Sequence, residues 1–189
     1  MLQLAKLFKL FSLSVILLLM ASCVRDVDFD QADEFAIEPV VEVSILYFDL
    51  KASTLGEITN NDLGGEIEET TRLDLFSDPF VEENLMEATF TFEFTNTIQR
   101  AFSAVIILLD EADNELRRIP IYVGESNGQE NVVRTIVNFD ATEVALLKQM
   151  ENLTVELGLE PGNPELDSNS PGNLYLKSAG TFFLNIDAD

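Results

Sequence analysis

The feature that most constrains the fold is the alternation of apolar and polar residues at every second position. Between residues 86 and 94, Met, Ala and Phe alternate with Glu and Thr. Successive residues of a strand point to opposite faces of a sheet, so the pattern predicts a half-buried antiparallel strand. Met86, Ala88, Phe90, Phe92 and Phe94 are expected on its core face.

The same alternation recurs around residues 41–47, 133–139, 153–159 and 174–186. In the first of these segments, the residues in phase are Val41, Val43, Ile45 and Tyr47. The last segment keeps one phase over its whole length, but small residues occupy positions 178–180 in its middle. They predict a bend, a bulge or a switch between sheets.

A hairpin is predicted between residues 102 and 123. The continuous apolar run at 102–109 is typical of a central strand, and an Asp- and Asn-rich turn separates it from a second strand at 116–123. Pro120 cannot donate a ladder hydrogen bond, and charged side chains such as Arg117 and Arg118 discourage further pairing. We therefore expect the second strand at the edge of its sheet.

Helix is expected in only a few places. Asp140 and Glu143 resemble a capping box and predict a short helix at 141–150. Pro79, after Ser77 and Asp78, predicts one further turn. Residues 51–76 are expected to form a long irregular connection with at most a short strand, and residues 161–173 a loop. Together these segments predict an all-β, immunoglobulin-like antiparallel sandwich of about 7–8 strands with one crossover helix.

The N-terminal segment carries an export signal. Lys6 and Lys9 precede an apolar run at residues 10–20, and Ala21 and Ser22 precede Cys23, the chain's single cysteine. The apolar run is shorter than the ~20 residues that cross a bilayer, so a secretory signal peptide is favoured over a membrane span. With its terminal cysteine the segment resembles the lipobox of bacterial lipoproteins.

The lipoprotein resemblance implies that Cys23 is acylated and becomes the mature N-terminus. Two or more acyl chains give stable membrane anchoring. Val24 follows where Asp would favour the inner membrane, so we expect the outer membrane, with the periplasmic or surface face left open. The domain prediction is a signal peptide at 1–22, a lipidated acidic tether at 23–37 and a single sandwich domain at 38–189.

The tether is acidic, and Asp26, Asp28 and Asp30 alternate in it. A calcium-binding EF-hand loop would need Gly and Glu where this chain has Gln31 and Ile37, so that motif is absent. Acidic residues shortly after the cysteine resemble surface-exported lipoproteins of Bacteroidota. The chain as a whole resembles small lipoproteins of that phylum. This resemblance implies a location in the cell envelope and implies no particular activity.

The charge restricts the partners. The formal net charge is −23, from 11 Lys and Arg against 34 Asp and Glu. Cleavage before Cys23 would remove two lysines and no acid, giving 9 − 34 = −25. Nucleic acid is not an expected partner, because phosphate binding needs clustered basic residues. The simplest interpretation of the negative charge is that it keeps the protein soluble on a crowded surface. The alternative is that it attracts cations or a basic partner.

The sequence contains few of the residues and motifs that enzymes use for catalysis. The chain contains no His, its only thiol is assigned to lipid, and no nucleophile-elbow, phosphate-loop or dinucleotide motif occurs. Carboxylates remain, and a pair of them could serve a hydrolase. With 34 acidic residues such pairs arise by chance. We therefore expect a non-enzymatic protein without a required cofactor, and keep a carboxylate-dependent hydrolase as the remote alternative.

Calcium is the one ligand that the composition permits. The candidate ligands are the oxygen-bearing residues of the predicted hairpin turn, Asp110, Asp113, Asn114 and Glu115. Asp and Asn are also common in turns for their local hydrogen bonds, which is the simpler explanation. A weaker candidate is the segment Asp167, Ser168 and Asn169.

The function expected from the sequence is binding or assembly. A lipid-anchored sandwich attached through Cys23 would contact a protein partner in the cell envelope. The first alternative is an accessory subunit of an outer-membrane transport or polysaccharide-handling complex, and the second is the hydrolase.

Overall fold

The structure is a computed structural model that describes residues 36–61 and 66–187. The chain divides into two compact units, Ile37–Ile186 and a second unit made of Met1–Ala36 and Asp187–Asp189. The fold described below is that of the first unit. Cys23, the predicted signal peptide and nearly all of the predicted tether lie outside the described residues.

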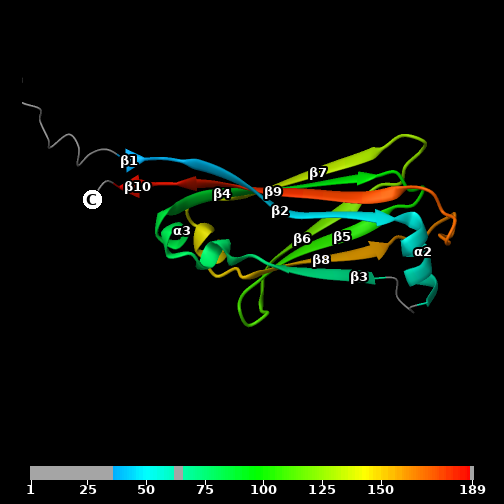
Figure 1. Cartoon of the computed structure of the whole chain (residues 1–189), viewed down its shortest axis with the longest axis horizontal. Coiled ribbons are helices and arrows are strands. Elements are labelled where there is room, and N and C mark those ends of the chain that lie inside the picture. The colour runs from blue at the N-terminus through cyan, green and yellow to red at the C-terminus, as the bar shows by residue number, and fades with distance from the viewer. Residues whose placement is uncertain (1–35, 62–65, 188–189) are drawn as a thin grey trace, which may run out of the picture. The chain divides into compact units, whose positions relative to one another are not determined.

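Eight strands form two four-stranded antiparallel sheets, seen as two layers in Figure 1. The first sheet has the order β2-β9-β4-β7, with bounds Val40–Lys51, Asn173–Leu184, Leu85–Asn96 and Asn131–Phe139. The second has the order β3-β8-β5-β6, with bounds Glu66–Arg72, Asn152–Leu159, Phe102–Leu109 and Glu115–Val123. Two short strands, β1 (Ala36–Ile37) and β10 (Ile186–Asp187), form a separate two-stranded sheet. The predicted all-β antiparallel sandwich is confirmed.

The strand order identifies the type of sandwich. Strands pair as mirror images about the central hairpin: β5 with β6, β4 with β7, β3 with β8 and β2 with β9. Such a series is one long hairpin rolled into two sheets, which is the order of a jelly roll. An immunoglobulin domain orders its strands differently. The immunoglobulin-like subtype predicted above is therefore corrected to a jelly roll, because alternation fixes strands and faces but not their partners.

The core lies between the two sheets. Phe90, Phe92 and Phe94 of β4 are fully buried there, as predicted. The ring of Phe90 contacts the rings of Phe92, Phe139 and Phe182, with centroids 5.1–6.3 Å apart. Burial of one such side chain contributes about 1.5–3 kcal/mol, so this aromatic cluster is a main source of stability.

A bulge in β2 changes the phase of the strand. The register with β9 shifts between Ser44 and Tyr47, opposite Ser178. The Ser178 hydroxyl fills the gap, because it accepts from the Leu46 amide at 2.9 Å and donates to the Leu46 carbonyl at 3.0 Å. The irregularity predicted at residues 178–180 is present, but it lies in the partner strand.

Two alternating residues consequently leave their predicted face. Beyond the bulge, Tyr47 points outward and is 58% exposed, instead of sharing the face of Val41 and Val43. A second bulge between Leu85 and Glu87 turns Met86 out of the core, and Leu85 is buried in its place. Each bulge adds one residue, which reverses the inward and outward positions on one side of it.

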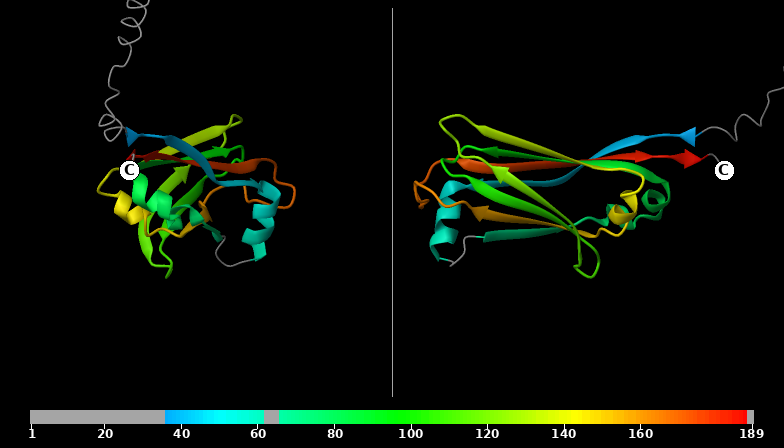
Figure 2. Two further views of the ribbon diagram at one scale, coloured as in Figure 1. Left: turned by 60° about the vertical axis from the view of Figure 1, so that its left-hand side comes forward. Right: turned by 180° about the vertical axis from the view of Figure 1, so that it is seen from behind.

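The segment at 51–76 is more regular than predicted. It forms helix α2 (Ala52–Asn61), strand β3 and the short helix η3 (Asp74–Ser77). In α2, Ala52 and Leu55 are buried and Gly56 approaches the backbone of the loop at 166–167. Figure 2 shows α2 beside this loop in both views. Packing against this loop accounts for α2. The sequence did not predict the helix, because residues typical of turns are frequent in this segment.

Of the two predicted helix starts, the one at Asp78 is confirmed, whereas Asp140 closes a turn and the helix after it begins only at Val144. Asp78 caps α3 (Pro79–Asn84) by accepting from the Phe80 amide at 2.8 Å. The Asp140 carboxylate accepts from the amides of Thr142 and Glu143 at 2.8 and 3.1 Å. The following helix α4 spans only Val144–Leu147 instead of 141–150, and it connects β7 of one sheet to β8 of the other.

The hairpin of β5 and β6 forms as predicted, with β5 central and β6 at an edge. Arg118 on β6 reaches across β5 to Glu156 on β8, with 3.1 Å between nitrogen and oxygen. Its partner across the ladder on β5 is Ile107, which is 5% exposed although it lies on the outer face. The long arginine side chain therefore covers this apolar residue.

Candidate functional site

The predicted calcium ligands lie in and beside the β5–β6 turn. One Asp110 oxygen accepts from the amides of Ala112 and Asn114, at 2.9 and 2.8 Å, and the Asn114 side chain donates to both Asp110 oxygens. Asp113 adopts a left-handed conformation with φ 60°. Glu115 points to Arg118 and pairs with it at 3.0 Å. The Asp110 carboxylate therefore accepts hydrogen bonds within its own turn and stabilises the turn.

These hydrogen bonds favour the ionised form of Asp110, and the bonds from Asn114 are the main reason that its pKa is lowered. Within the described ranges, no group of three or more His, Cys, Asp or Glu is placed to hold a metal ion. Asp167 resembles Asp110, since it accepts from the Asn169 amide and the Ser170 hydroxyl. Calcium binding at either turn stays a prediction, which a calcium titration of the melting temperature would test.

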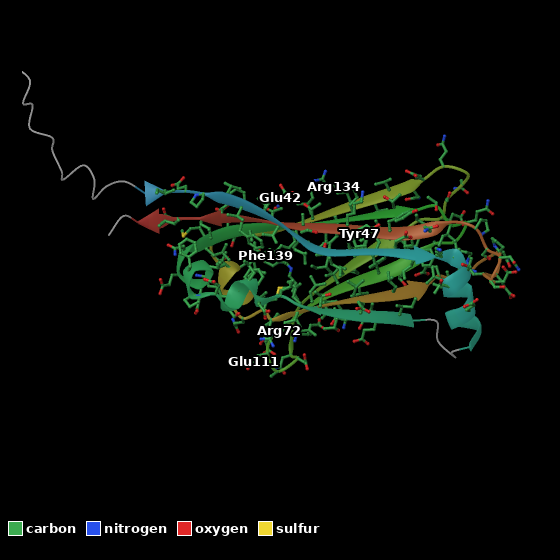
Figure 3. All side chains as sticks on the ribbon, in the orientation of Figure 1. Glu42, Tyr47, Arg72, Glu111, Arg134 and Phe139 are labelled. Carbon is green, nitrogen blue, oxygen red and sulfur yellow. The ribbon has the colours of Figure 1, made fainter. Side chains whose placement is uncertain are left out.

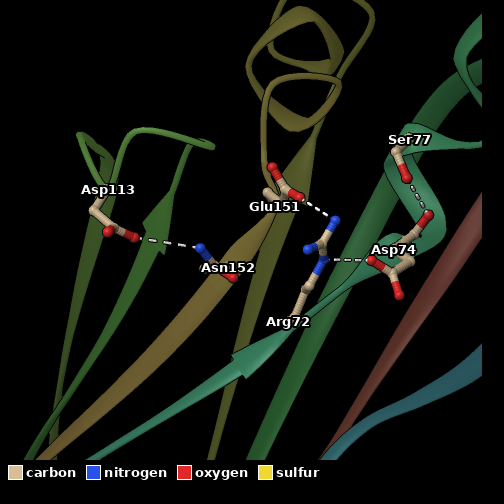
Figure 4. Close-up of polar contacts among 6 residues, drawn as sticks. All are labelled: Arg72, Asp74, Ser77, Asp113, Glu151 and Asn152. Carbon is tan, nitrogen blue, oxygen red and sulfur yellow. Dashed lines mark hydrogen bonds and ion pairs between the residues drawn. The ribbon is translucent and has the colours of Figure 1, made fainter.

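A polar network of two adjacent groups of contacts joins this turn to β8 and the end of β3 to the residue before β8 (Figure 4). Arg72 at the end of β3 pairs with Asp74 at 2.6 Å and with Glu151 before β8. Asn152 donates to Asp113 at 3.3 Å. The pKa of Arg72 is raised, mainly by the hydrogen bond to Asp74.

A concavity of about 430 Å³ lies beside the network. Its lining residues come from η3, the β5–β6 turn and the α4–β8 connection: Phe76, Ser77, Asp110, Glu111, Ala112, Lys148, Gln149, Met150 and Glu151. The carboxyl pKa shifts resolved in the described residues, at Asp110 and Asp140, are both downward. A general acid needs a shift in the opposite direction, so these two groups are suited to hydrogen bonding.

The more unusual surface is the first half of β2, residues 40–44, which we call the β2 edge. All five residues are exposed, so neither face of this stretch is covered. Val40 is 60% exposed, Val41 42% and Val43 37%. Because β2 ends the strand order of its sheet, no described strand pairs with its free side. All three valines are thus available for contact, including Val41 and Val43, which the alternation placed together on one face of the strand.

An apolar opening, which we call the core slot, separates the β2 edge from the end of β3. It measures about 130 Å³ and is lined by residues 43–45 of β2, residues 72–76, and Phe90 and Phe182. Arg72 and Asp74 bring charge to this lining, and the Phe rings belong to the core cluster. The slot therefore joins the hydrophobic core to the surface beside the free edge of β2.

A shallow groove continues the apolar surface on the other side of β2. Its volume is about 310 Å³, and its lining includes Val40, Met86 and Phe183. These side chains are 60%, 47% and 37% exposed. Contiguous apolar surface on a soluble domain commonly marks a contact with another molecule. The bulge between Leu85 and Glu87 turns Met86 into this groove, and the end position of β2 in its sheet leaves the β2 edge unpaired, so alternation alone predicted neither surface.

Figure 3 shows how side chains divide between the faces of the first sheet. Glu42 and Arg134 lie on its outer side, and Phe139 lies between the sheets. In the middle of the outer face Lys177 and Arg134 flank Glu93, each opposite it across a ladder. Within the β2 edge, Glu42 is the one charged residue. Among the described residues no helix is long and apolar enough to cross a membrane.

Comparison with known proteins gives no family. No protein-family model matches the chain, and no curated protein matches its sequence. Solved structures with similar folds include the VP2 subviral particle of infectious bursal disease virus, with TM-score 0.43, 9% identity, and coverage of 79% of this chain and 41% of that one. A predicted secreted protein of Parabacteroides distasonis has TM-score 0.39 and 15% identity, over 60% of this chain and 37% of that one.

The enzymatically active domain of bacteriophage CBA120 tailspike protein 4 has TM-score 0.37 and 11% identity, over 75% of this chain and 19% of that one. The chain spans about two fifths or less of the length of these three structures. Similarities of this size carry no functional information.

Proposed function

We propose that this protein is a lipid-anchored outer-membrane protein whose jelly-roll domain binds another protein of the cell envelope and catalyses no reaction. The anchor is supported by the sequence, through the lipobox-like segment that ends at Cys23. The binding role rests on one observation, the exposure of the β2 edge on both faces beside the core slot. The accessory-subunit alternative is one form of this proposal, in which the partner is a membrane complex.

The anchor is tested by membrane fractionation of the wild-type protein and a Cys23→Ala variant. The wild-type protein is expected in the membrane fraction, and the variant is expected to be released because it lacks acyl chains. Mass spectrometry of the wild-type N-terminal peptide should show the lipid. A variant that stays in the membrane fraction contradicts the anchor.

The binding role is tested by photo-crosslinking in cells. A photoreactive residue at position 40 should give a discrete adduct with a second protein, because Val40 lies on the β2 edge. The matched control is position 122, where Tyr122 is 65% exposed on β6 of the other sheet. The same adduct from both positions, or none from position 40, contradicts a binding surface at β2.

A further inference from the structure

The direction of the β2 backbone can be derived from one hydrogen bond. The Leu184 amide donates to the Pro39 carbonyl at 3.1 Å, so residue 39 points its backbone oxygen toward β9. Backbone groups of a strand point alternately to its two sides. Residues 40, 42 and 44 therefore direct their N–H and C=O groups to the free side, where an added strand would find them.

Two of the other free edges carry devices that discourage pairing. Strand β6 contains Pro120 and the charged Arg118, and β3 carries Glu68 and Glu69 in succession. Charged residues and proline are the usual means of blocking an edge. The β2 edge instead presents three valines within four positions and a single charge. Strand β7 has a similar composition, with Arg134 as its one charge and Val132 and Ile136 each 55% exposed, so the core slot beside residues 43–45 is what distinguishes the β2 edge.

The core slot determines which side chains an added strand could bring. A strand alongside residues 43–45 would point alternate side chains toward Phe90 and Phe182. The slot's volume of about 130 Å³ is comparable with the ~150 Å³ apolar cavity that accepts benzene. An aliphatic side chain fits this space and would cover the exposed ends of the core.

Charge selects between a second copy of this chain and a different partner. Glu42 lies at the middle of the β2 edge, and the formal net charge of −23 opposes self-association. A symmetric pairing of two β2 edges centred on residue 42 would also bring two Glu42 side chains together. Lys or Arg on the incoming strand, at the positions facing Glu42, would complement the charge.

We propose that the β2 edge binds an extended segment of a partner protein as an added β-strand, with aliphatic side chains in the core slot and basic side chains facing Glu42. This mode of recognition is β-augmentation, in which backbone hydrogen bonds give affinity and pockets for alternate side chains give specificity. The inference rests on the proposed binding function and specifies the partner's chemistry.

The test uses a short, capped, fluorescent peptide that alternates lysine with isoleucine, titrated against the full-length protein in detergent. Saturable binding is expected, and a peptide with glutamate in place of lysine should bind about tenfold more weakly or worse. N-methylation of the alternate amides that face β2 should abolish binding, whereas N-methylation of the other set should not. Equal binding of both methylated peptides overturns the proposal.

The matched variants are Glu42→Pro and Glu42→Thr. Proline removes the outward N–H, which β9 does not use, so about tenfold weaker binding is expected with little change in melting temperature. Threonine removes only the charge and should retain more of the affinity. A spin label on the peptide should broaden NMR signals of β2 and not those of β7. Broadening centred on β7 overturns the proposal.

The failures of the two proposals are distinguishable. Crosslinking at position 40 together with no peptide binding rejects strand addition and leaves the binding function standing. Absence of the adduct rejects the binding function itself. Sedimentation of the peptide-free protein tests the second copy, since a dimer abolished by Glu42→Pro would overturn the choice of a different partner.

Discussion

At the scale of single residues, a few buried polar side chains fix the irregular parts of the fold. Arg100 is 6% exposed, and its guanidinium donates to the carbonyls of Pro164, at 2.8 Å, and Glu160. No carboxylate pairs with it among the described residues. The Asn96 side chain donates to the Arg100 backbone carbonyl at 2.7 Å and so fixes the backbone at Arg100. The loop between β8 and β9 is thus held by a buried cation.

Replacing Arg100 by alanine should destabilise the protein and release this loop. Two carbonyl groups lose their donors, and an unsatisfied buried group costs about 1–3 kcal/mol. The measurement is the free energy of unfolding in urea, with limited proteolysis of residues 161–172. Arg134→Ala, an exposed arginine on β7, is the control and should have little effect. Equal stability of the two variants would contradict the role of Arg100.

Asp110 gives a pH dependence whose sign follows from its lowered pKa. The folded-state pKa lies below the ordinary value of 3.8, so the carboxylate stabilises the turn above that pH and loses its effect as the pH falls through the folded-state value. Asp110→Asn should therefore narrow the difference in melting temperature between neutral and acidic pH. An unchanged pH profile in the variant would contradict this assignment.

At the scale of the elements, bulges decide which side chains reach the surface. Alternation predicted the strands and most of the core, because burial of one sheet face imposes a period of two on the sequence. It missed the positions of Tyr47 and Met86, because an inserted residue leaves the local pattern intact and reverses only its phase. The β2 edge and the core slot depend on strand pairing and on how the two sheets meet, which local sequence does not encode.

Replacing Ser178 by alanine should test the bulge in β2. The hydroxyl satisfies both backbone groups of Leu46, so its loss is expected to cost about 1–3 kcal/mol in unfolding free energy. Ser103→Ala is the control, since its hydroxyl contacts the Gly158 carbonyl only at 3.4 Å. Urea denaturation measures both variants, and a larger loss for Ser103→Ala would count against the bulge's dependence on Ser178.

Gly56 tests the helix that sequence patterns did not predict. A Cβ at this position would lie 2.6 Å from the Asp167 backbone nitrogen, closer than packed atoms tolerate. Gly56→Ala should therefore lower the melting temperature, although alanine favours helices. Thr54→Ala, at an exposed position of α2, should leave it unchanged or raise it. Stabilisation by Gly56→Ala would mean that α2 does not pack against the loop.

At the scale of the whole described fold, local stability should follow the nested strand order. Strands β5 and β8 lie in the interior of the second sheet, and each pairs with a neighbour on both sides. The β2 edge, in contrast, is covered on neither face. Amide hydrogen exchange should be slow in β5 and β8 and fast at residues 40, 42 and 44, whose N–H groups face solvent. Equal protection along β2 would contradict the derived backbone direction.

The mirror-image pairing also sets an order of events in time. Leu46 and Ser178 are 132 positions apart and must meet to close the β2–β9 ladder, while the β5–β6 hairpin joins near neighbours. A chain that emerges from its N-terminus therefore carries β2 without its partner β9 until nearly all residues have appeared. During synthesis, β2 therefore waits longer for its partner than β3, β4 or β5 does, and its valines stay exposed until β9 has appeared.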